Sequence, residues 1–409
     1  MREMKDSGIS FIGMIPSDWN VTRNKNVFSC TKELVGTASS ETQLLSLTTK
    51  GIKEKDVNNP EGKLPESFDT YQFVKKNDIV MCLFDLDVSA VFSGLSLYDG
   101  MISPAYRVLH CKNNIIPKFA DYWFRYISDG RKFNHYAKNI RYTLNYEDFS
   151  TLPIVQPPID RQCRIADYLD EKCSKIDAII EKQQTVIEKL KVYKLSKINE
   201  LIVEVEGQSI HLGYIANMKN GLNFNAAPSG KPLKFLGVGD FKDYFVLDRE
   251  DMFSDILIDE EIDEDYMLKD GDIVFVRSNG SKDLVGRAVM VENIDFPLSY
   301  SGFCIRFRNI RTDILNDRYL LYFFRSPYFR EQLKKYSQGS NINNINQVLL
   351  SKISITVPSI EIQKRAIDDV ERLSYNLDKT ILGKQAVIDK LIAYKKSLIY
   401  EVVTGKKEI

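Results

Sequence analysis

The sequence repeats itself, and this repeat constrains the fold more than any other feature. The second half of the 409-residue chain matches the first at a displacement of 201 residues, where IDKLIAYKKSLIYEVV from Ile388 falls on IEKLKVYKLSKINELI from Ile187. A chain of this length exceeds the size at which one hydrophobic core usually stops growing. The repeat therefore predicts two similar domains, each followed by a similar segment.

Shorter matches extend the repeat toward the start of each half. The displacement stays at 201 residues for the matched prolines and glutamines and shrinks slightly farther upstream, as expected if the two halves differ in loop length. The matched elements are Pro157 with Pro358, Gln162 with Gln363, KNDIVMCLF around Asp78 with DGDIVFVRS around Asp272, and Asp121-Tyr122-Trp123 with Asp317-Arg318-Tyr319. Each half thus reads as a mixed α/β segment that leads into a proline-containing extended stretch.

A long helix is predicted after each of these stretches, Leu152–Pro158 and Ile353–Pro358. Proline disfavours the helical conformation in the residue before it, so it marks the boundary. The following segments, about Asp160–Val203 and Glu361–Val403, contain no proline. At about 1.5 Å per residue, each helix would be roughly 65 Å long.

An apolar heptad runs along both predicted helices. This pattern is typical of a coiled-coil seam, so we expect the helices to pack antiparallel and to place one domain at each end. The alternative is that each helix packs only on its own domain, but a helix this long would overhang a domain of about 150 residues. We expect a partner or water to meet the seam at its polar interruptions. The apolar positions are Leu169, Cys173, Ile176, Ile180, Ile187, Leu190 and Leu201 in the first helix and Ile367, Val370, Leu377, Ile381, Ile388, Leu391, Leu398 and Val402 in the second, interrupted by Gln183, Lys194 and Lys197 and by Ser374, Lys384 and Lys395.

The predicted fold class is α/β (α+β), with two similar mixed domains separated by two long helices in a pseudo-twofold antiparallel coiled coil. We expect the first domain at residues 1–158 and its helix at 159–205. The second domain is expected at 206–359, and its helix with the C-terminal tail at 360–409. Residues 1–158 are called domain 1 below, and residues 206–359 domain 2.

Composition excludes several classes of protein. Lys and Arg together number 56, as do Asp and Glu, so no strong positive field announces nucleic-acid binding, and residues 248–265 are markedly acidic. The six cysteines form no CxxC pair and the three histidines lie far apart in sequence, which argues against a zinc site. No apolar stretch approaches the ~20 residues that span a bilayer, and the N-terminus lacks an apolar signal core, so we expect a cytoplasmic protein with no membrane partner.

Four segments resemble the specificity subunits of type I restriction-modification systems, over essentially the whole chain. They are SGISFIGMIPSDWNVTR, YDGMISPAYRVL, PPIDRQCRIADYLDEK and YKKSLIYEVVTGKKEI. The second half departs from the pattern because it lacks the double proline and a second DW-type start. The resemblance implies a non-catalytic subunit in which each domain is a target recognition domain that reads one half of a bipartite site in double-stranded DNA.

The resemblance also implies partners and cofactors. It implies two methyltransferase subunits that carry S-adenosylmethionine and methylate adenine, joined by motor-nuclease subunits for ATP-dependent cleavage. We expect this chain itself to bind no cofactor, with S-adenosylmethionine, ATP and Mg²⁺ on the partner subunits. The alternative without the resemblance is a coiled-coil adaptor that binds protein or RNA.

The motifs that could indicate catalysis in this chain fail on inspection. Residues 235–239 fit FxGxG, and Gln156-Pro157-Pro158-Ile159 is faintly similar to the NPPY-like motif of adenine methyltransferases. That motif needs an Asn, Asp or Ser and a stacking aromatic residue, which Gln156 and Ile159 do not supply. No GxxxxGK[ST] loop for ATP phosphates is present. We therefore predict no catalytic, cofactor-binding or metal-binding residues.

Candidate DNA contacts are cations and amides on loops that a rigid sheet carries. Less specific candidates are the turn Thr48–Gly51 and the carboxylates Asp85 and Asp87, which could accept from a cytosine amino group or could cap a turn. For all of these loops the alternative is an ordinary solvated connection. The main candidates are Arg277, Ser278, Asn279, Ser281 and Lys282 after a predicted strand of domain 2, Gln338, Ser340, Asn341 and Asn343 after a helix rich in Tyr and Phe, and, by the repeat, Lys138, Asn139, Arg141, Tyr142 and Asn145 in domain 1.

Overall fold

The structure is a computed structural model, and the chain in it divides into two compact units. It describes residues 2–49, 51–57, 65–86, 92–136, 142–223, 230–259, 261–281, 283–336 and 344–409. Unit 1 comprises residues 1–183 and 386–409, and unit 2 comprises residues 184–385. Domain 1 belongs to unit 1 and domain 2 to unit 2.

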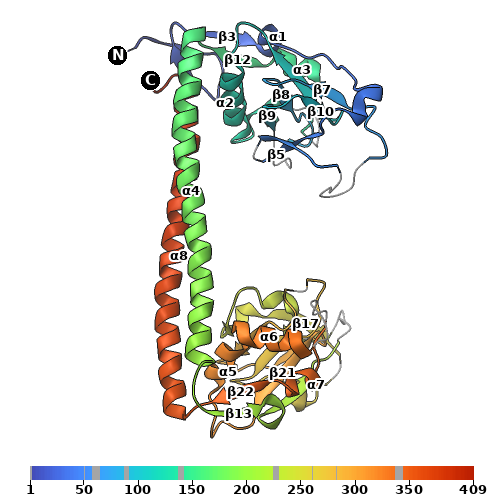
Figure 1. The fold of residues 1–409 in the computed structure, drawn as a ribbon, viewed down its shortest axis with the longest axis vertical. Coiled ribbons are helices and arrows are strands. Elements are labelled where there is room, and N and C mark those ends of the chain that lie inside the picture. The colour runs from blue at the N-terminus through green and yellow to red at the C-terminus, as the bar shows by residue number, and fades with distance from the viewer. Residues whose placement is uncertain are drawn as a thin grey trace. The chain divides into compact units, whose positions relative to one another are not determined.

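Two helices of 44 residues each begin in one unit and end in the other: α4, Ile159–Ile202, and α8, Ile360–Val403 (Figure 1). The predicted bounds are confirmed to within one residue. Every predicted apolar heptad position is buried or partly buried, which confirms the heptad frame. A second apolar row, outside that frame, is also buried at the C-terminal end of each helix: Ile198 and Ile202 in α4, and Ile399 and Val403 in α8.

In unit 1, the first part of α4 packs antiparallel against the last part of α8. Lys395 Nζ lies 2.6 Å from the Asp177 carboxylate. Nine residues earlier in α4, the Tyr168 ring lies 6.0 Å from Lys407 Nζ, beyond the end of α8. An earlier residue of α4 thus contacts a later residue of the C-terminal segment, as expected for antiparallel helices.

Unit 2 repeats this arrangement with the opposite parts of the helices. Ile202 of α4 and Ala366 of α8 belong to one hydrophobic core, and Lys194 Nζ lies 2.8 Å from Asp378. Lys194 and Lys395 stand at predicted interruptions of the seam, and the facing helix of the same unit supplies a carboxylate to each.

Domain 1 consists of short strands with helices packed against them. The strand β8 is fully buried and lies between β11 and β9 in the order β4-β11-β8-β9. Helix α2 packs against β9 and β8 and buries Trp123 and Phe124. The elements are β1 Met4–Asp6, β2 Met14–Pro16, β3 Asn20–Arg23, α1 Asn24–Val27, β4 Phe28–Ser29, η1 Gly36–Ser40, β5 Leu45–Thr48, β6 Gly51–Glu54, β7 Gln72–Val74, β8 Ile79–Met81, β9 Ser93–Leu95, β10 Gly100–Ile102, β11 Arg107–Cys111, α2 Pro117–Ser128, η2 Lys132–Tyr136, α3 Tyr146–Thr151 and β12 Pro153–Gln156, where η denotes a 3-10 helix.

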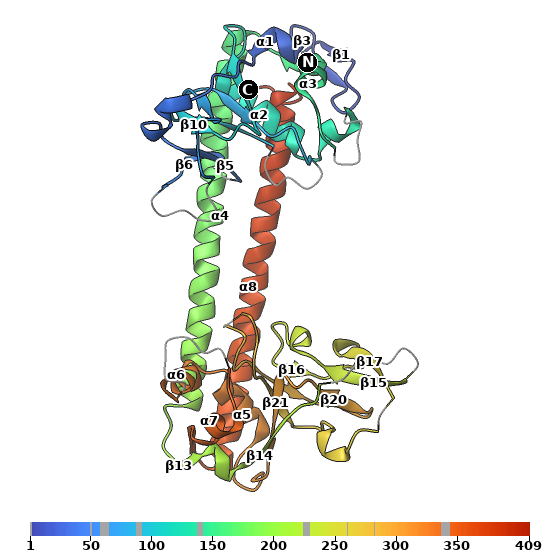
Figure 2. The ribbon, with the colours of Figure 1, turned by 90° about the vertical axis from the view of Figure 1, so that its right-hand side faces the viewer.

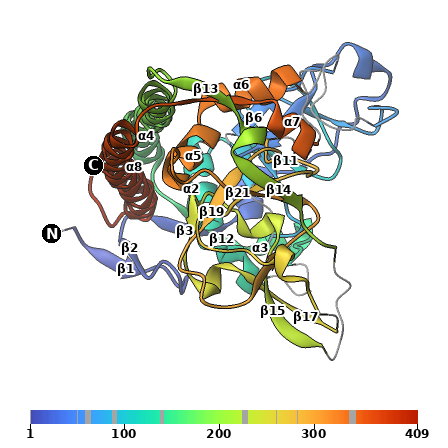
Figure 3. The same cartoon turned by 90° about the horizontal axis from the view of Figure 1, so that it is seen from below.

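Domain 2 has the same order of central elements in a larger sheet, β14-β21-β18-β19-β16, with β18 again buried at its centre. A second sheet, β17-β15-β20, lies on the opposite side of the domain from α6 and α7 (Figure 2, Figure 3). The elements are β13 Gln208–His211, η3 Leu212–Tyr214, β14 Ala216–Asn220, β15 Lys231–Leu236, η4 Val238–Asp240, β16 Val246–Leu247, η5 Glu250–Met252, β17 Ser254–Ile258, η6 Glu264–Tyr266, β18 Ile273–Val276, β19 Ala288–Val291, β20 Leu298–Tyr300, β21 Cys304–Asn309, α5 Asp317–Phe324, α6 Pro327–Tyr336, α7 Gln347–Ser351 and β22 Ser354–Val357.

An aspartate turn precedes the central strand of each domain. Asp78 Oδ2 accepts from the Lys75 amide at 2.7 Å before β8. Asp272 Oδ2 accepts from the Lys269 amide at 2.8 Å before β18. The sequence match of KNDIVMCLF with DGDIVFVRS is therefore confirmed as a match between equivalent turns and strands.

A buried glutamine near the start of each long helix secures the loop that leads into α2 or α5. Gln162 Oε1 accepts from the Ile116 amide at 2.8 Å, and Gln363 Oε1 accepts from the Asn316 amide at 2.9 Å. Each side-chain amide donates to the carbonyl of the matched proline, Pro157 or Pro358, at 2.8 and 2.9 Å. The matches of the prolines and of the glutamines therefore correspond to the same hydrogen-bonded arrangement in both halves.

The match of Asp121-Tyr122-Trp123 with Asp317-Arg318-Tyr319 is wrong by about one helical turn. Helix α2 begins at Pro117 and α5 at Asp317, which sets the displacement there at 200 residues. Consistent with this, Tyr122 Oη donates to Asp170 of α4, and Tyr322 Oη donates to Glu371 of α8. An amphipathic helix repeats its apolar pattern every turn, so a slip of one turn preserves that pattern.

The two ends of the chain meet within unit 1 (Figure 1). Lys406 Nζ donates to the Ile12 carbonyl at 2.8 Å. Gly405 has a φ of +72°, and a Cβ there would lie 2.4 Å from Pro16 Cδ, so only glycine fits without a shift. The first and last of the four segments that carry the family resemblance thus pack on each other.

Candidate DNA interface

In domain 2, the start of the candidate loop after β18 lies beside the described residues that precede α7. The Ile345 amide donates to the Arg277 carbonyl at 2.9 Å, and Ser278 forms an antiparallel bridge with Asn344. The segment that follows β18 is thereby joined to the segment that precedes α7. Two stretches far apart in sequence form one polar edge beyond the central strand.

Domain 1 joins the corresponding segments in the same way. The Leu144 amide donates to the Leu83 carbonyl at 2.8 Å, and the Leu86 amide donates to the Tyr142 carbonyl at 3.3 Å. The segment after β8 is therefore the structural counterpart of the Arg277 segment.

Arg277 is held at this edge by its own contacts. Its backbone amide donates to the Phe303 carbonyl at 2.7 Å, and its Nη1 donates to the Gly302 carbonyl at 3.3 Å. The side chain remains partly exposed and makes no ion pair with any described residue. A guanidinium that is positioned but not neutralised is suited to contact a phosphate or a base edge.

The other predicted residues of domain 2 divide into two groups. Ser278 is partly exposed beside Asn344, whereas Asn279 Oδ1 accepts from the exposed Ser281 amide at 2.7 Å and so closes a local turn. Lys282, Gln338, Ser340, Asn341 and Asn343 lie outside the described residues.

In domain 1, Tyr142 and Asn145 fall within the described part of the chain. Tyr142 is 38% exposed and has a φ of +46°, uncommon for a non-glycine residue. Asn145 is the N-cap of α3, where its Oδ1 accepts from the Asp148 amide at 2.7 Å, and Asn346 caps α7 in the same way at 2.8 Å. Capping occupies the Asn145 oxygen but leaves its NH₂ group available. Lys138, Asn139 and Arg141 lie outside the described residues.

The less specific candidates of domain 1 lie in turns. Asp85 has a φ of +48°, uncommon for a non-glycine residue. Thr48 Oγ1 donates to the Gly51 carbonyl at 2.8 Å and closes the β5–β6 hairpin. Asp87 and Lys50 lie outside the described residues.

One exposed aromatic side chain at the loop edge of domain 2 was not among the residues predicted from the sequence. Phe303 is 57% exposed in the turn between β20 and β21, directly beside Arg277. The corresponding connection in domain 1, between β10 and β11, carries Pro104 and Ala105. The sequence signal that could have predicted this exposure is Ser-Gly-Phe between two apolar strands. An aromatic residue in such a short turn lies outside the hydrophobic core. Proteins that deform DNA insert such apolar side chains between base steps.

Hydrogen-bonded side-chain pairs fix the sheet behind these loops. In domain 2, Asp272 is buried, and Arg308 donates to both of its carboxylate oxygens, at 2.7 and 2.6 Å. These hydrogen bonds raise the pKa of Arg308. In domain 1, His110 Nδ1 lies 2.7 Å from Asp78 instead. The pairs lock the strands that carry the loops.

Four features of the described residues bear on possible catalysis: the Cys304 thiol, the FxGxG segment, Gln156 and groups that could bind a metal ion. Burial raises the pKa of the Cys304 thiol to about 12, so this thiol is un-ionised at neutral pH. In the FxGxG segment, the Gly237 amide already donates to Asp240 Oδ2 at 2.7 Å. Gln156 lies in β12 and donates to the Asn114 carbonyl at 2.8 Å. No group of three or more His, Cys, Asp or Glu side chains among the described residues is arranged to hold a metal ion.

Comparison with known proteins places part of the sequence in a family. The family model of the type I restriction modification DNA specificity domain matches residues 209–389. The StySPI specificity subunit of Salmonella potsdam, from a type I restriction enzyme, is 26% identical over 144 residues, which are 35% of this chain and 30% of that protein. The chain thus matches under a third of that relative. The MjaVIII specificity subunit of Methanocaldococcus jannaschii is 24% identical over 371 residues, 81% of this chain and 80% of that protein.

A solved structure gives a likeness in fold across the whole chain. It comes from work described as "Structural basis underlying complex assembly and conformational transition of the type I R-M system". Its TM-score is 0.73 with 14% sequence identity, and the match covers 96% of this chain and 99% of that one. No helix among the described residues is long and apolar enough to cross a bilayer.

Proposed function

We propose that this chain, whose residues 209–389 match the type I restriction modification DNA specificity domain, is the DNA-reading subunit of a type I restriction-modification complex. Each of its two domains would read one half of a bipartite, gapped site in double-stranded DNA. The domain bounds proposed for this role are residues 1–158 and 206–359. The long helices would set the spacing between the half-sites and dock the methyltransferase subunits.

The observation that carries the proposal is the paired loop edge, which occurs once in each domain. In domain 2 the edge joins Arg277 and Ser278 to Asn344 and Ile345. In domain 1 it joins Leu83 and Leu86 to the 142–144 segment. Two equivalent edges on two similar domains suit a two-part site, because half-sites that face one side of DNA recur about every 34–36 Å.

The chemistry of the complex is assigned to its partners. We propose that this chain is non-catalytic and acts with two methyltransferase subunits, which would bind S-adenosylmethionine and methylate adenine. Motor-nuclease subunits would add ATP- and Mg²⁺-dependent cleavage. The contribution of this chain would be the choice of sequence.

Methylation mapping tests the proposal directly. The full chain is co-expressed with the adenine methyltransferase of its system in a host that lacks both, and methylated adenines are mapped across the genome. We expect one gapped, two-part motif. The matched control expresses the methyltransferase alone and should give no such motif. Methylation without a motif, or none from a complex that co-purifies intact, would overturn the proposal.

Arg277→Ala tests the proposed edge of domain 2. If Arg277 makes a bidentate contact with a base, the substitution should weaken binding of the assembled complex to its cognate DNA by about 1–3 kcal/mol. Binding is measured by fluorescence anisotropy at fixed salt. Arg311→Ala is the matched control, because Arg311 is exposed in the same domain and already paired with Asp313 at 2.8 Å. Unchanged methylation of both cognate and altered half-sites would remove Arg277 from the interface.

A further inference from the structure

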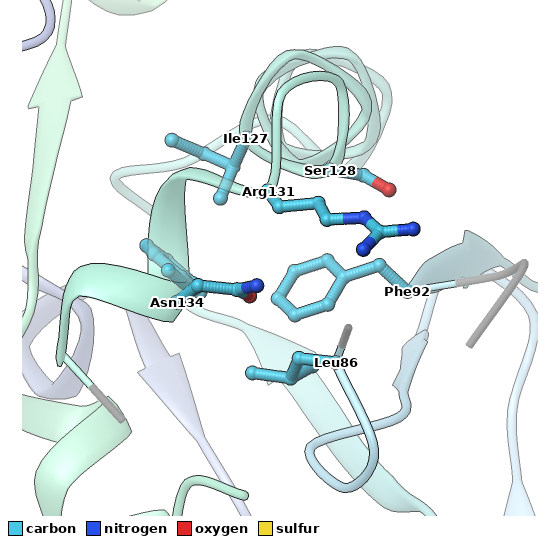
Figure 4. Close-up of a pocket in the computed structure, with 7 residues that line it drawn as sticks. Leu86, Phe92, Ile127, Ser128, Arg131 and Asn134 are labelled. Atoms are coloured by element: carbon cyan, nitrogen blue, oxygen red, sulfur yellow. The ribbon is translucent and has the colours of Figure 1, made fainter. Parts of the chain in front are cut away.

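Domain 1 contains a cavity beside its loop edge. The cavity has a volume of about 230 Å³ and opens between the end of α2, the helix η2 and the segment after β8 (Figure 4). This is smaller than the ~300–1,000 Å³ of pockets for drug-sized ligands. Its lining residues are Leu86, Phe92, Ile127, Ser128, Arg131, Phe133 and Asn134.

The inner wall of the cavity is apolar and partly aromatic. Phe92, Ile127 and Phe133 are almost fully buried, and the rings of Phe92 and Phe133 lie 5.4 Å apart, edge to face. In Figure 4 the Phe92 ring lies between the Arg131 side chain and Leu86. A flat heterocycle could therefore meet both apolar surface and an aromatic ring.

The rim of the cavity is polar. The Ser128 hydroxyl, the Arg131 guanidinium and the Asn134 amide make no hydrogen bond or ion pair with a described side chain or carbonyl. Arg131 also has a φ of +52°, a conformation that a non-glycine residue adopts at an energetic cost and that often accompanies a functional site. Together these groups offer both donors and acceptors to an occupant.

Domain 2 shows that the fold does not require this cavity. There α6 follows α5 in the place where η2 follows α2, and its Leu333 is fully buried. A Cβ added to Gly286 would lie 2.6 Å from Leu333 Cδ1, and Arg330 Nη1 donates to the Val285 carbonyl. The longer helix of domain 2 thus packs directly against the connection from β18 to β19.

We propose that the cavity of domain 1 accepts one nucleobase that has left the DNA stack within the half-site read by that domain. This inference rests on the proposed function. Pockets for extruded bases combine apolar or aromatic stacking surfaces with hydrogen bonds to the edge of the base. Leu86 lines the cavity and its amide donates to the Tyr142 carbonyl, so the cavity adjoins the edge proposed to contact DNA.

Base unstacking in the intact complex tests the inference, once methylation mapping has given the motif. 2-Aminopurine replaces each purine in turn and pyrrolocytosine each cytosine, while permanganate reports unstacked thymines. We expect one position in one half-site, other than the methylated adenine, to become unstacked on binding. Arg131→Ala and Asn134→Ala should abolish that signal and weaken binding about tenfold, the size expected for loss of one base contact. Ser128→Phe, which fills the cavity from its rim, should abolish the signal as well.

The control is Lys76→Ala, which removes an exposed cation of domain 1 outside the cavity lining and should leave the unstacking signal intact. Sequence-specific binding with every position stacked, apart from the methylated adenine, would overturn the inference and leave the proposed function standing. An unstacking signal that survives all three cavity variants would also overturn it. Absence of any sequence-specific binding by the assembled complex would overturn the proposed function itself.

Discussion

Domains 1 and 2 share a hydrogen-bonded frame but differ in the side chains that complete it. Both place an aspartate turn before the buried central strand, a capping asparagine before α3 or α7, and a glutamine between the long helix and the loop before α2 or α5. Domain 2 pairs its aspartate with Arg308, whereas domain 1 uses His110. Domain 2 fills the space beside its loop edge with α6, whereas domain 1 leaves a cavity.

The comparison of domains 1 and 2 indicates which contacts of such a domain can differ and which are shared. The shared contacts are side-chain hydrogen bonds to backbone atoms, so they fix where strands and helices begin without specifying the residues around them. Of the divergent features, the cavity adjoins the loop edge of domain 1, and the aspartate pairs lie at the start of the central strands. A frame of this kind can keep its geometry while the surface proposed to contact DNA varies.

The largest predicted effect comes from breaking the aspartate pair of domain 2. Arg308→Leu would leave the buried Asp272 carboxylate without its cation and should destabilise domain 2 by about 3–5 kcal/mol. His110→Leu should cost domain 1 about 1 kcal/mol, because it removes a single side-chain hydrogen bond. Hydrogen exchange read by mass spectrometry measures the local free energy of opening in each domain.

Equal effects of these two substitutions would show that the His110 and Arg308 pairs are energetically interchangeable. The exchange pattern supplies the internal control, because each substitution should accelerate exchange only in its own domain.

A smaller effect is expected from the two glutamines. Gln363→Leu removes the partners of the Asn316 amide and of the Ile314 and Pro358 carbonyls and should destabilise unit 2 by about 3 kcal/mol. Gln162→Leu should cost unit 1 less, because the Asn114 carbonyl still accepts from Gln156. Urea denaturation followed by hydrogen exchange measures both. A larger loss from Gln162→Leu would contradict this order.

The smallest effect is expected at the seam between the long helices. Lys194→Met and Lys395→Met each remove one ion pair to an aspartate that is more than half exposed, at Asp378 and Asp177. Each should change the free energy of unfolding by less than about 1 kcal/mol, and by similar amounts. Double-mutant cycles with Asp378→Ala and Asp177→Ala measure the coupling. A coupling energy well above about 1 kcal/mol at only one of the two sites would show that the two ion pairs are not equivalent.

The sequence predicted the long helices and their seam because proline boundaries and a heptad pattern are local signals. It also identified Asp78 with Asp272 and Gln162 with Gln363, since these residues carry the shared frame. It misplaced the match between α2 and α5 by one turn, because the apolar pattern of a helix recurs each turn. It missed Phe303, whose exposure depends on how the β20–β21 turn leaves the sheet.

The sequence by itself determined that the chain is a duplicated α/β domain with two coiled-coil helices, since repeats and periodicity are written along the chain. Only the tertiary structure decided that the seam lysines pair with aspartates, that the segment after β18 joins the segment before α7, and that domain 1 keeps a cavity where domain 2 packs a helix. These contacts join residues far apart in sequence. Hydrogen bonds and packing act over a few ångströms, so such contacts exist only after the fold has brought their partners together.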